Sequence, residues 1–464
     1  MRSRTARAQP KRRAACLLLS LLCCLLSASS LICFAQTPST PGAEQETAQP
    51  QAPTATPEQQ ATPERQRVTS YTLPPDKYEQ AVTLSNIYYR LHFIGVGYSL
   101  LLLLLLLLMR VAPVFRGWAE AASGRRLVQA IIFVPLLLSL WSLLHLPLGI
   151  YGHNLQLRYG LSVQGWGSWF WDWAKGLLVM LVLGTLLVRL LLAVIRRSPR
   201  RWWLYFWLAM LPIMVFIVFI APVALDPLFN RFEPLEPKQP RLVAELEKVV
   251  KRGGLSIPRE RMFEMNASEK TRTLNAYVTG VGVTKRVVVW DTTIEKMNTA
   301  QTLFIFGHEM GHYVLGHILK GMAAAALGML LLFFALYHAV RWVLGRRGER
   351  WAIRGADDWA ALPLLMLFFV LFTFLAEPVA NGFSRYLEHE ADIYGLEVTH
   401  GITPDSAEAA AESFQVLGET SLSHPSPPAF VRFWLFSHPP IAERLRFAQD
   451  YDPWSKGQPR RFIP

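Results

Sequence analysis

The sequence predicts a mainly helical protein that crosses a membrane several times and also carries a smaller part with some β structure. Of its 464 residues, 52% are hydrophobic, and the mean hydropathy is +0.24. The apolar residues come in six long blocks, each able to form the helix of about 20 residues that crosses a bilayer. One such block could be a buried core helix, but six of them exclude that interpretation for the whole chain.

The first 75 residues precede these blocks and are expected to be a targeting signal followed by a tether. Residues 1–35 begin with basic side chains, continue into an apolar core and end in a small-x-small sequence, which is typical of a cleaved signal peptide. A retained membrane span is the alternative, since residues 14–35 are just long enough. Residues 36–75 are rich in Pro, Gln and Thr, so we expect a disordered tether. All four cysteines precede residue 36, so a mature chain would have neither disulfides nor thiolate ligands.

Four predicted spans belong to an N-terminal membrane domain, residues 76–232, and two belong to a metallopeptidase domain, residues 233–464. The spans are expected at residues 91–109, 127–149, 176–195, 203–225, 319–344 and 359–379. Arginine-rich loops follow the first, third and fifth spans, and such loops usually face the cytoplasm. Much of the net charge of +13 therefore borders the membrane, which explains it better than nucleic-acid binding does.

A His-Glu-x-x-His motif at residues 308–312 is the strongest functional signal in the chain. On a helix, His308 and His312 lie on one face, one turn apart. Two neutral imidazoles so placed can bind Zn²⁺ and leave room for a third ligand and a water, with Glu309 beside that water as a general base. A chance match is the alternative, but polar groups that interrupt an apolar helix are costly without a purpose.

A third ligand is expected beyond the sixth span, where acidic residues follow Ser384. On a helix, Arg385, Glu388 and Asp392 share one face. Glu388 can bind zinc, and Asp392 can accept the second N–H of a ligand histidine and so fix its tautomer. Arg385 can neutralise part of the negative charge. On its own this pattern would indicate only a solvated charged face.

Three nearby polar residues are expected to be poorer candidates for metal binding. His389 and Glu390 fall off the face that carries the third ligand. His317 follows His308 by nine residues, which on one continuous helix points it to the opposite side. We therefore expect His317 in solvent or at the membrane edge.

Two strands are expected between the fourth span and the metal motif. Residues 286–290 alternate and end before an aspartate, and residues 275–282 close with two glycines. The pair could form an edge that receives an extended peptide through main-chain hydrogen bonds. A purely structural hairpin is the alternative.

From about residue 143 to its end, the chain resembles the CAAX prenyl protease 1 family of integral-membrane zinc endopeptidases, with heat-shock membrane proteases as more distant relatives. The motifs that carry this resemblance, in family order, are Leu144-His-Leu-Pro-Leu-Gly-Ile-Tyr-Gly-His, Asp226-Pro-Leu-Phe-Asn-Arg-Phe-Glu-Pro-Leu, Asn275-Ala-Tyr, Lys285-Arg286 with Asp291-Thr292, His308–His312, Ser384-Arg385-x-x-Glu388-x-x-Ala391-Asp392 and Ser437-His438-Pro439.

The resemblance implies a ring of membrane helices that encloses a chamber, with a zincin-like domain whose metal site faces that chamber. It implies one zinc ion per chain on the two motif histidines and Glu388, with Glu309 as catalytic base. It further implies that Asn275 and His438 contact the substrate or the oxyanion. The eukaryotic members have seven spans and a cytosolic metal domain, whereas six spans are counted here and the arginine loops favour a periplasmic metal face.

These observations predict a zinc metalloendopeptidase of a bacterial inner membrane that acts on membrane-associated or misfolded proteins. Its partners would be peptide substrates and the lipid bilayer, with no nucleic acid. One alternative is a dedicated processing protease for CAAX-type prenylated peptides. Another is a non-catalytic membrane chaperone or scaffold with a structural zinc, although a closed structural site needs a fourth protein ligand. A zinc transporter would cluster histidines and acids within its spans, and the spans here do not.

Overall fold

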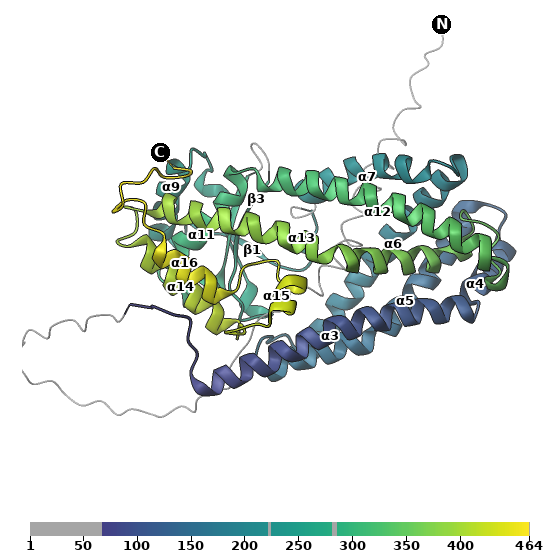
Figure 1. Cartoon of the computed structure of the whole chain (residues 1–464), viewed down its shortest axis with the longest axis horizontal. Coiled ribbons are helices and arrows are strands. Elements are labelled where there is room, and N and C mark those ends of the chain that lie inside the picture. Colours follow the sequence, from purple (N-terminus) through teal and green to yellow (C-terminus); the bar gives the residue numbers. More distant parts are fainter. Residues whose placement is uncertain (1–66, 221–223, 281–284, 464) are drawn as a thin grey trace, which may run out of the picture.

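The computed structural model describes residues 67–220, 224–280 and 285–463. The predicted signal peptide, residues 1–35, and most of the predicted tether, residues 36–75, lie outside the described residues. The described chain is elongated, with long helices at one end and a small sheet surrounded by shorter helices at the other (Figure 1). The predicted fold class, a membrane helical bundle joined to a part with a small β element, is confirmed.

Six helices in the described part of the chain are long and apolar enough to cross a membrane. They correspond to the six predicted spans: α3 (Pro75–Leu108), α5 (Arg126–Arg158), α6 (Trp166–Arg197), α7 (Trp202–Phe219), α12 (His317–Arg347) and α13 (Leu362–Thr399). A helix of the 38 residues of α13 is about 57 Å long, roughly twice the apolar thickness of a bilayer. The sixth span and the predicted third-ligand segment form one continuous helix, with Pro378 near the end of the predicted span.

An additional helix, α4 (Val111–Ala122), follows the first span, where the sequence predicted only a loop. It buries Ala112 and Ala119 against the bundle and leaves Trp118 exposed. The buried Arg116 pairs with Asp358, which lies just before the sixth span. Twelve residues with one buried stripe were too short to distinguish from a loop by periodicity.

A four-stranded sheet stands beside the metal motif, in the order β1-β2-β4-β3. Its strands are β1 (Phe232–Pro234), β2 (Met262–Met265), β3 (Ala276–Thr279) and β4 (Arg286–Trp290). The two predicted strands are confirmed as β3 and β4, which pair antiparallel. Strand β3 forms one edge of the sheet and packs against the helix that carries the metal motif.

Shorter helices, one of which carries the metal motif, make up much of the part of the chain drawn toward the left of Figure 1. They are α9 (Pro240–Arg252), α10 (Asp291–Lys296), α11 (Thr299–Val314), α14 (Ser406–Thr420), α15 (Ala429–Leu435) and α16 (Ile441–Asp450). Their common core includes Phe304, Phe306 and Phe414, which are fully buried. The long helix α13 runs from this core into the membrane bundle (Figure 1).

The last residues of the predicted tether lie against this core. The main chain of Thr72 exchanges two hydrogen bonds with the side-chain amide of Gln415 on α14. Tyr71 is buried and donates a hydrogen bond to the carbonyl of Ser423. Residues 67–74 are therefore held on the metal-bearing part, because an aromatic side chain there finds an apolar site.

Candidate active site

The metal motif lies on α11, whose ends are defined by local sequence. Asn298 and Gln301 form a capping box at its start, each side chain bonding the other's backbone N–H. The helix ends at Val314, and Gly316 adopts a left-handed conformation with φ of 68° before α12 begins. Most of α11 is buried, so the motif is held rigidly against its neighbours.

Glycines bring α11 and α13 into close contact beside the motif. A Cβ atom on Gly395 would lie 3.1 Å from the backbone nitrogen of His308, and one on Gly307 would lie 2.8 Å from a methyl group of Val398. Any side chain at these positions would push the two helices apart. Their close approach brings Glu388 on α13 within reach of both motif histidines.

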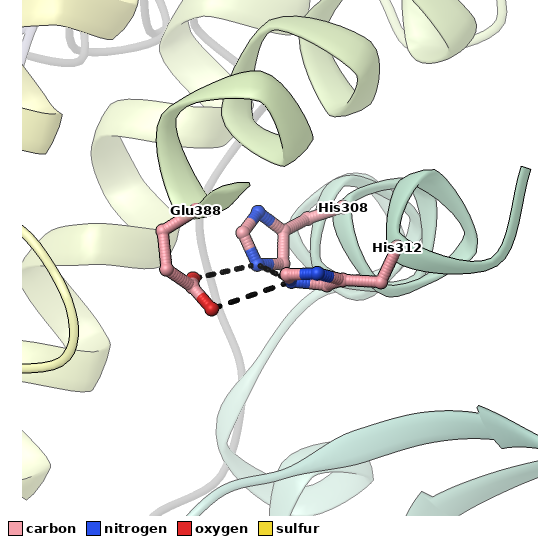
Figure 2. A group of neighbouring side chains, drawn as sticks. All are labelled: His308, His312 and Glu388. Atoms are coloured by element: carbon pink, nitrogen blue, oxygen red, sulfur yellow. Dashed lines mark hydrogen bonds and ion pairs between the residues drawn. The ribbon is translucent and has the colours of Figure 1, made fainter. Parts of the chain in front are cut away.

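Three side chains then converge on one point, as Figure 2 shows. The Nε2 atoms of His308 and His312 lie 3.2 Å apart. The two oxygens of Glu388 lie 3.2 Å from Nε2 of His308 and 3.4 Å from Nε2 of His312. Ligand bonds of about 2.0–2.2 Å in a tetrahedral zinc site place ligand atoms about 3.3–3.6 Å apart. These three residues therefore fit a metal site, and the buried Oε2 of Glu388 has no hydrogen-bond partner in the described structure.

A buried ion pair, formed by Asp392 and Arg444, lies beside His308. The Nδ1 atom of His308 is 2.9 Å from Oδ1 of Asp392, the residue predicted to fix the tautomer of a ligand histidine. Arg444 on α16 donates two hydrogen bonds to the same carboxylate, of 2.9 and 2.6 Å. Asp392 is thus a charged acceptor held in a fixed orientation, which favours His308 with its Nε2 lone pair toward the metal.

The sequence analysis did not identify Arg444 and predicted that Arg385 would neutralise the negative charge of the site. The Arg385 guanidinium instead donates to the main-chain carbonyls of Arg432 and Phe436, because α15 and the loop after it cover that side of α13. One signal was available. Arg444 precedes Leu445 on the apolar face of the short helix α16, where a charge requires a buried partner.

The position of His317 corrects a second prediction. The sequence placed His317 on the side of the helix opposite His308, in solvent or at the membrane edge, but it is buried beside the motif, with Nδ1 3.1 Å from Nδ1 of His312. The prediction assumed one continuous helix, whereas the chain turns at Gly316. Glu390, also set aside, is buried with an oxygen 3.4 Å from Nε2 of His317. Gly316 was the available signal in the sequence, because a glycine just after a helical segment often marks the end of the helix.

The two residues predicted to contact substrate, His438 and Asn275, lie in different parts of the site. Nε2 of His438 is 3.2 Å from Oε1 of Glu388, and about half of its side chain is exposed. Asn275 immediately precedes β3 and is part of the sheet edge beside α11. Among the described residues, its recorded hydrogen bonds are made by its main chain, with Thr293 and Trp290.

The protein groups alone set unusual proton affinities at the site. Burial disfavours a charged His308, but the neighbouring carboxylates of Asp392 and Glu388 outweigh burial and raise its pKa to about 10. Burial, with the neighbouring His308 charge, lowers the pKa of His312 to about 3. Burial raises the pKa of Glu309 to about 7, with Glu388 adding to the effect and His308 opposing it. A carboxyl group whose pKa is near neutral pH can both take up and release a proton during a reaction.

Two family models together match most of the chain. Residues 236–452 match peptidase family M48. Residues 58–231 match the model described as CAAX prenyl protease N-terminal, five membrane helices. The described part of that second region contains four of the candidate spans.

Relatives of known sequence agree with these matches. An uncharacterized metalloprotease, YhfN, of Bacillus subtilis is 37% identical over 81% of this chain and 86% of its own length. The CAAX prenyl protease 1 homolog of Oryza sativa is 25% identical over 81% of this chain and 88% of its own. CAAX prenyl protease 1 of Saccharomyces cerevisiae is 26% identical over 70% of this chain and 72% of its own.

A solved structure shares the fold. The crystal structure of S. mikatae Ste24p superposes with a TM-score of 0.70 at 20% identity, and the match covers 94% of this chain and 99% of that one. The arrangement of a bundle of long helices joined to a part with a small sheet is therefore a known architecture. The enclosed chamber implied by the sequence resemblance stays a prediction. A cavity of about 600 Å³ among the described residues lies between α13, α15 and α16.

Proposed function

Because this chain belongs to peptidase family M48 and is a membrane-embedded metalloendopeptidase, we propose that its metal is one zinc ion held by His308, His312 and Glu388. The observation that carries this proposal is the convergence of three side chains: the two Nε2 atoms lie 3.2 Å apart, and each lies 3.2–3.4 Å from one oxygen of Glu388. Three protein ligands leave a position for water or substrate, which is the pattern of a catalytic rather than a structural zinc site. This argues against the non-catalytic scaffold.

Each neighbouring residue has a separate task in this proposal. When bound, zinc would polarise the scissile carbonyl and lower the pKa of a bound water. Glu309 would act as the general base that takes a proton from the attacking water and then gives it to the leaving amine. His438 and Asn275 donate hydrogen bonds to the developing oxyanion. The free edge of β3 receives the substrate as an extended strand through main-chain hydrogen bonds.

The proposed substrates are membrane-associated or misfolded proteins. The supporting observation is the continuity of α13, which carries both a candidate span and Glu388 and therefore ties the site to the bilayer. The second candidate, a dedicated processor of prenylated peptides, is favoured by the similarity to the CAAX prenyl protease 1 proteins of Oryza sativa and Saccharomyces cerevisiae.

The proposed position is a bacterial inner membrane with the metal site on the periplasmic face. Contacts between arginine-rich loops, such as Arg110 with the carbonyl of Arg350 and Arg354 with Glu120, gather them at the end of the bundle away from the metal site. Cytoplasmic loops carry such arginines. A cysteine introduced at exposed Lys456 should react with a membrane-impermeant thiol reagent in cells with a permeabilised outer membrane; labelling only after inner-membrane lysis would reverse the orientation.

Proteolysis by purified protein in detergent tests the function. We expect cleavage of a denatured membrane-protein reporter, loss of cleavage with a zinc chelator and its return when zinc is added. A farnesylated CAAX peptide is assayed in parallel. Cleavage of that peptide alone would select the processing enzyme. Cleavage of neither substrate, with zinc bound, would contradict the enzymatic assignment of the site.

A further inference from the structure

The two motif histidines are supported in different ways. A metal ligand that binds through Nε2 carries its proton on Nδ1, and that N–H needs an acceptor. For His308 the acceptor is the Asp392 carboxylate at 2.9 Å. For His312 the nearest recorded partner is another imidazole, His317, with the two Nδ1 atoms 3.1 Å apart.

With His312 bound to the proposed metal through Nε2, this contact sets the tautomers of both rings. Because His312 donates from Nδ1, His317 must accept at Nδ1 and carry its own proton on Nε2. That Nε2 lies 3.4 Å from Oε2 of Glu390, without the alignment of a full hydrogen bond. His317 and Glu390 are 3% and 5% exposed, so solvent does not supply the missing partner.

Glu390 is held as a carboxylate by three donors from separate parts of the chain. Tyr386, one turn earlier on α13, donates to Oε1 at 3.0 Å. Arg461, in the C-terminal segment, donates to the same oxygen at 2.8 Å. Lys320 on α12 donates to Oε2 at 3.3 Å. A carboxylate that accepts from three donors is held in a fixed position, and it places its negative charge 3.4 Å from Nε2 of His317.

We propose that His317, backed by Glu390, is a positioning residue that orients His312 and fixes the tautomer whose Nε2 faces the metal. The inference rests on the proposed zinc site and names the support of its second histidine. His308 is supported directly by the Asp392 carboxylate. His312 is supported by His317, which in turn faces the Glu390 carboxylate. This support also connects the site to α12 and to the C-terminal segment through the partners of Glu390.

The test is the zinc dissociation constant of the purified full-length protein, measured by competition with a chromogenic chelator. His317→Phe keeps the ring shape but removes the acceptor, and loss of such a support costs about 10–100-fold in metal affinity. His317→Gln restores an acceptor and should recover much of that loss. The matched control is His338→Phe, the same change at an exposed position farther along α12.

Two further measurements separate positioning from a general packing role. The visible spectrum of the Co²⁺-loaded protein should shift in His317→Phe, while kcat at saturating zinc falls and KM stays near that of the wild type. A wild-type dissociation constant and cobalt spectrum in His317→Phe would overturn the inference. If that variant is not recovered folded, Glu390→Gln decides, with a raised dissociation constant in support and a wild-type value against.

Failure of the zinc site itself would look different. His312→Ala should lose zinc binding if the proposed ligands are correct. Retained stoichiometric zinc in His312→Ala would refute the proposed site. Loss in His312→Ala beside wild-type affinity in His317→Phe would refute only the positioning role.

Discussion

Replacing Glu309 with glutamine is expected to lower kcat by about 10²–10⁴-fold, the usual contribution of a general acid–base group. The amide has the size of the carboxylate but cannot take a proton from water. Zinc should stay bound, because Glu309 is not one of the three converging ligands. Turnover of the reporter and zinc content by atomic absorption are measured together. The matched control is Glu295→Gln, a change at an exposed carboxylate on α10.

The pH dependence of kcat/KM gives a second readout of the same residue. A base must be deprotonated to act, so activity should fall as pH falls through the pKa of Glu309. The protein groups alone raise that pKa to about 7, mainly by burial, and the positive charge of zinc lowers it. The acid limb should therefore lie below pH 7 and be absent from the residual activity of Glu309→Gln. Full activity in that variant would remove Glu309 from the mechanism.

Replacing Arg444 with methionine is expected to destabilise the metal-bearing part by about 3–5 kcal/mol, the cost of removing one partner of a buried ion pair. The change leaves the Asp392 carboxylate, which is 1% exposed, without its two guanidinium hydrogen bonds. Asp392 then holds His308 less firmly, so zinc affinity should fall as well. Thermal unfolding of the zinc-loaded protein in detergent measures the first effect, and chelator competition measures the second.

Arg446→Met provides the control for this prediction, since Arg446 lies on the exposed face of the same helix α16. Arg444→Lys should lie between the two, because lysine restores the charge without the two-pronged geometry. Equal unfolding temperatures for Arg444→Met and Arg446→Met would mean that the ion pair contributes nothing to stability.

The sequence predicted those features that depend on local periodicity. Six spans, two strands and the helical placement of Glu388 and Asp392 follow from the spacing of apolar and polar residues along single elements. The placement of Glu388 required one further assumption, that two helices far apart in sequence pack together. Gly307 and Gly395 allow that packing, but neither is recognisable as an interhelical contact from sequence alone.

The features that the sequence missed depend on a chain turn or on contacts between distant elements. His317 was misplaced because the helical count was continued past Gly316. Arg444 was missed because its partner Asp392 lies on another helix, 52 residues away. The same limit applies to residues 67–74, whose docking on α14 depends on Tyr71 finding an apolar site more than 300 residues later.

The proline within α13 has a mechanical consequence for an enzyme in a bilayer. Pro378 lacks the N–H that would bond one turn back, so the helix bends most easily between its lipid-facing part and Glu388. A span tilts when the surrounding hydrocarbon layer becomes thinner or thicker. The part of α13 that carries Glu388 packs tightly against α11 at Gly395. A change in the tilt of the membrane-spanning part should therefore bend the helix at Pro378 and leave the ligands in place. We therefore expect the geometry of the catalytic centre to be insulated from changes in membrane thickness.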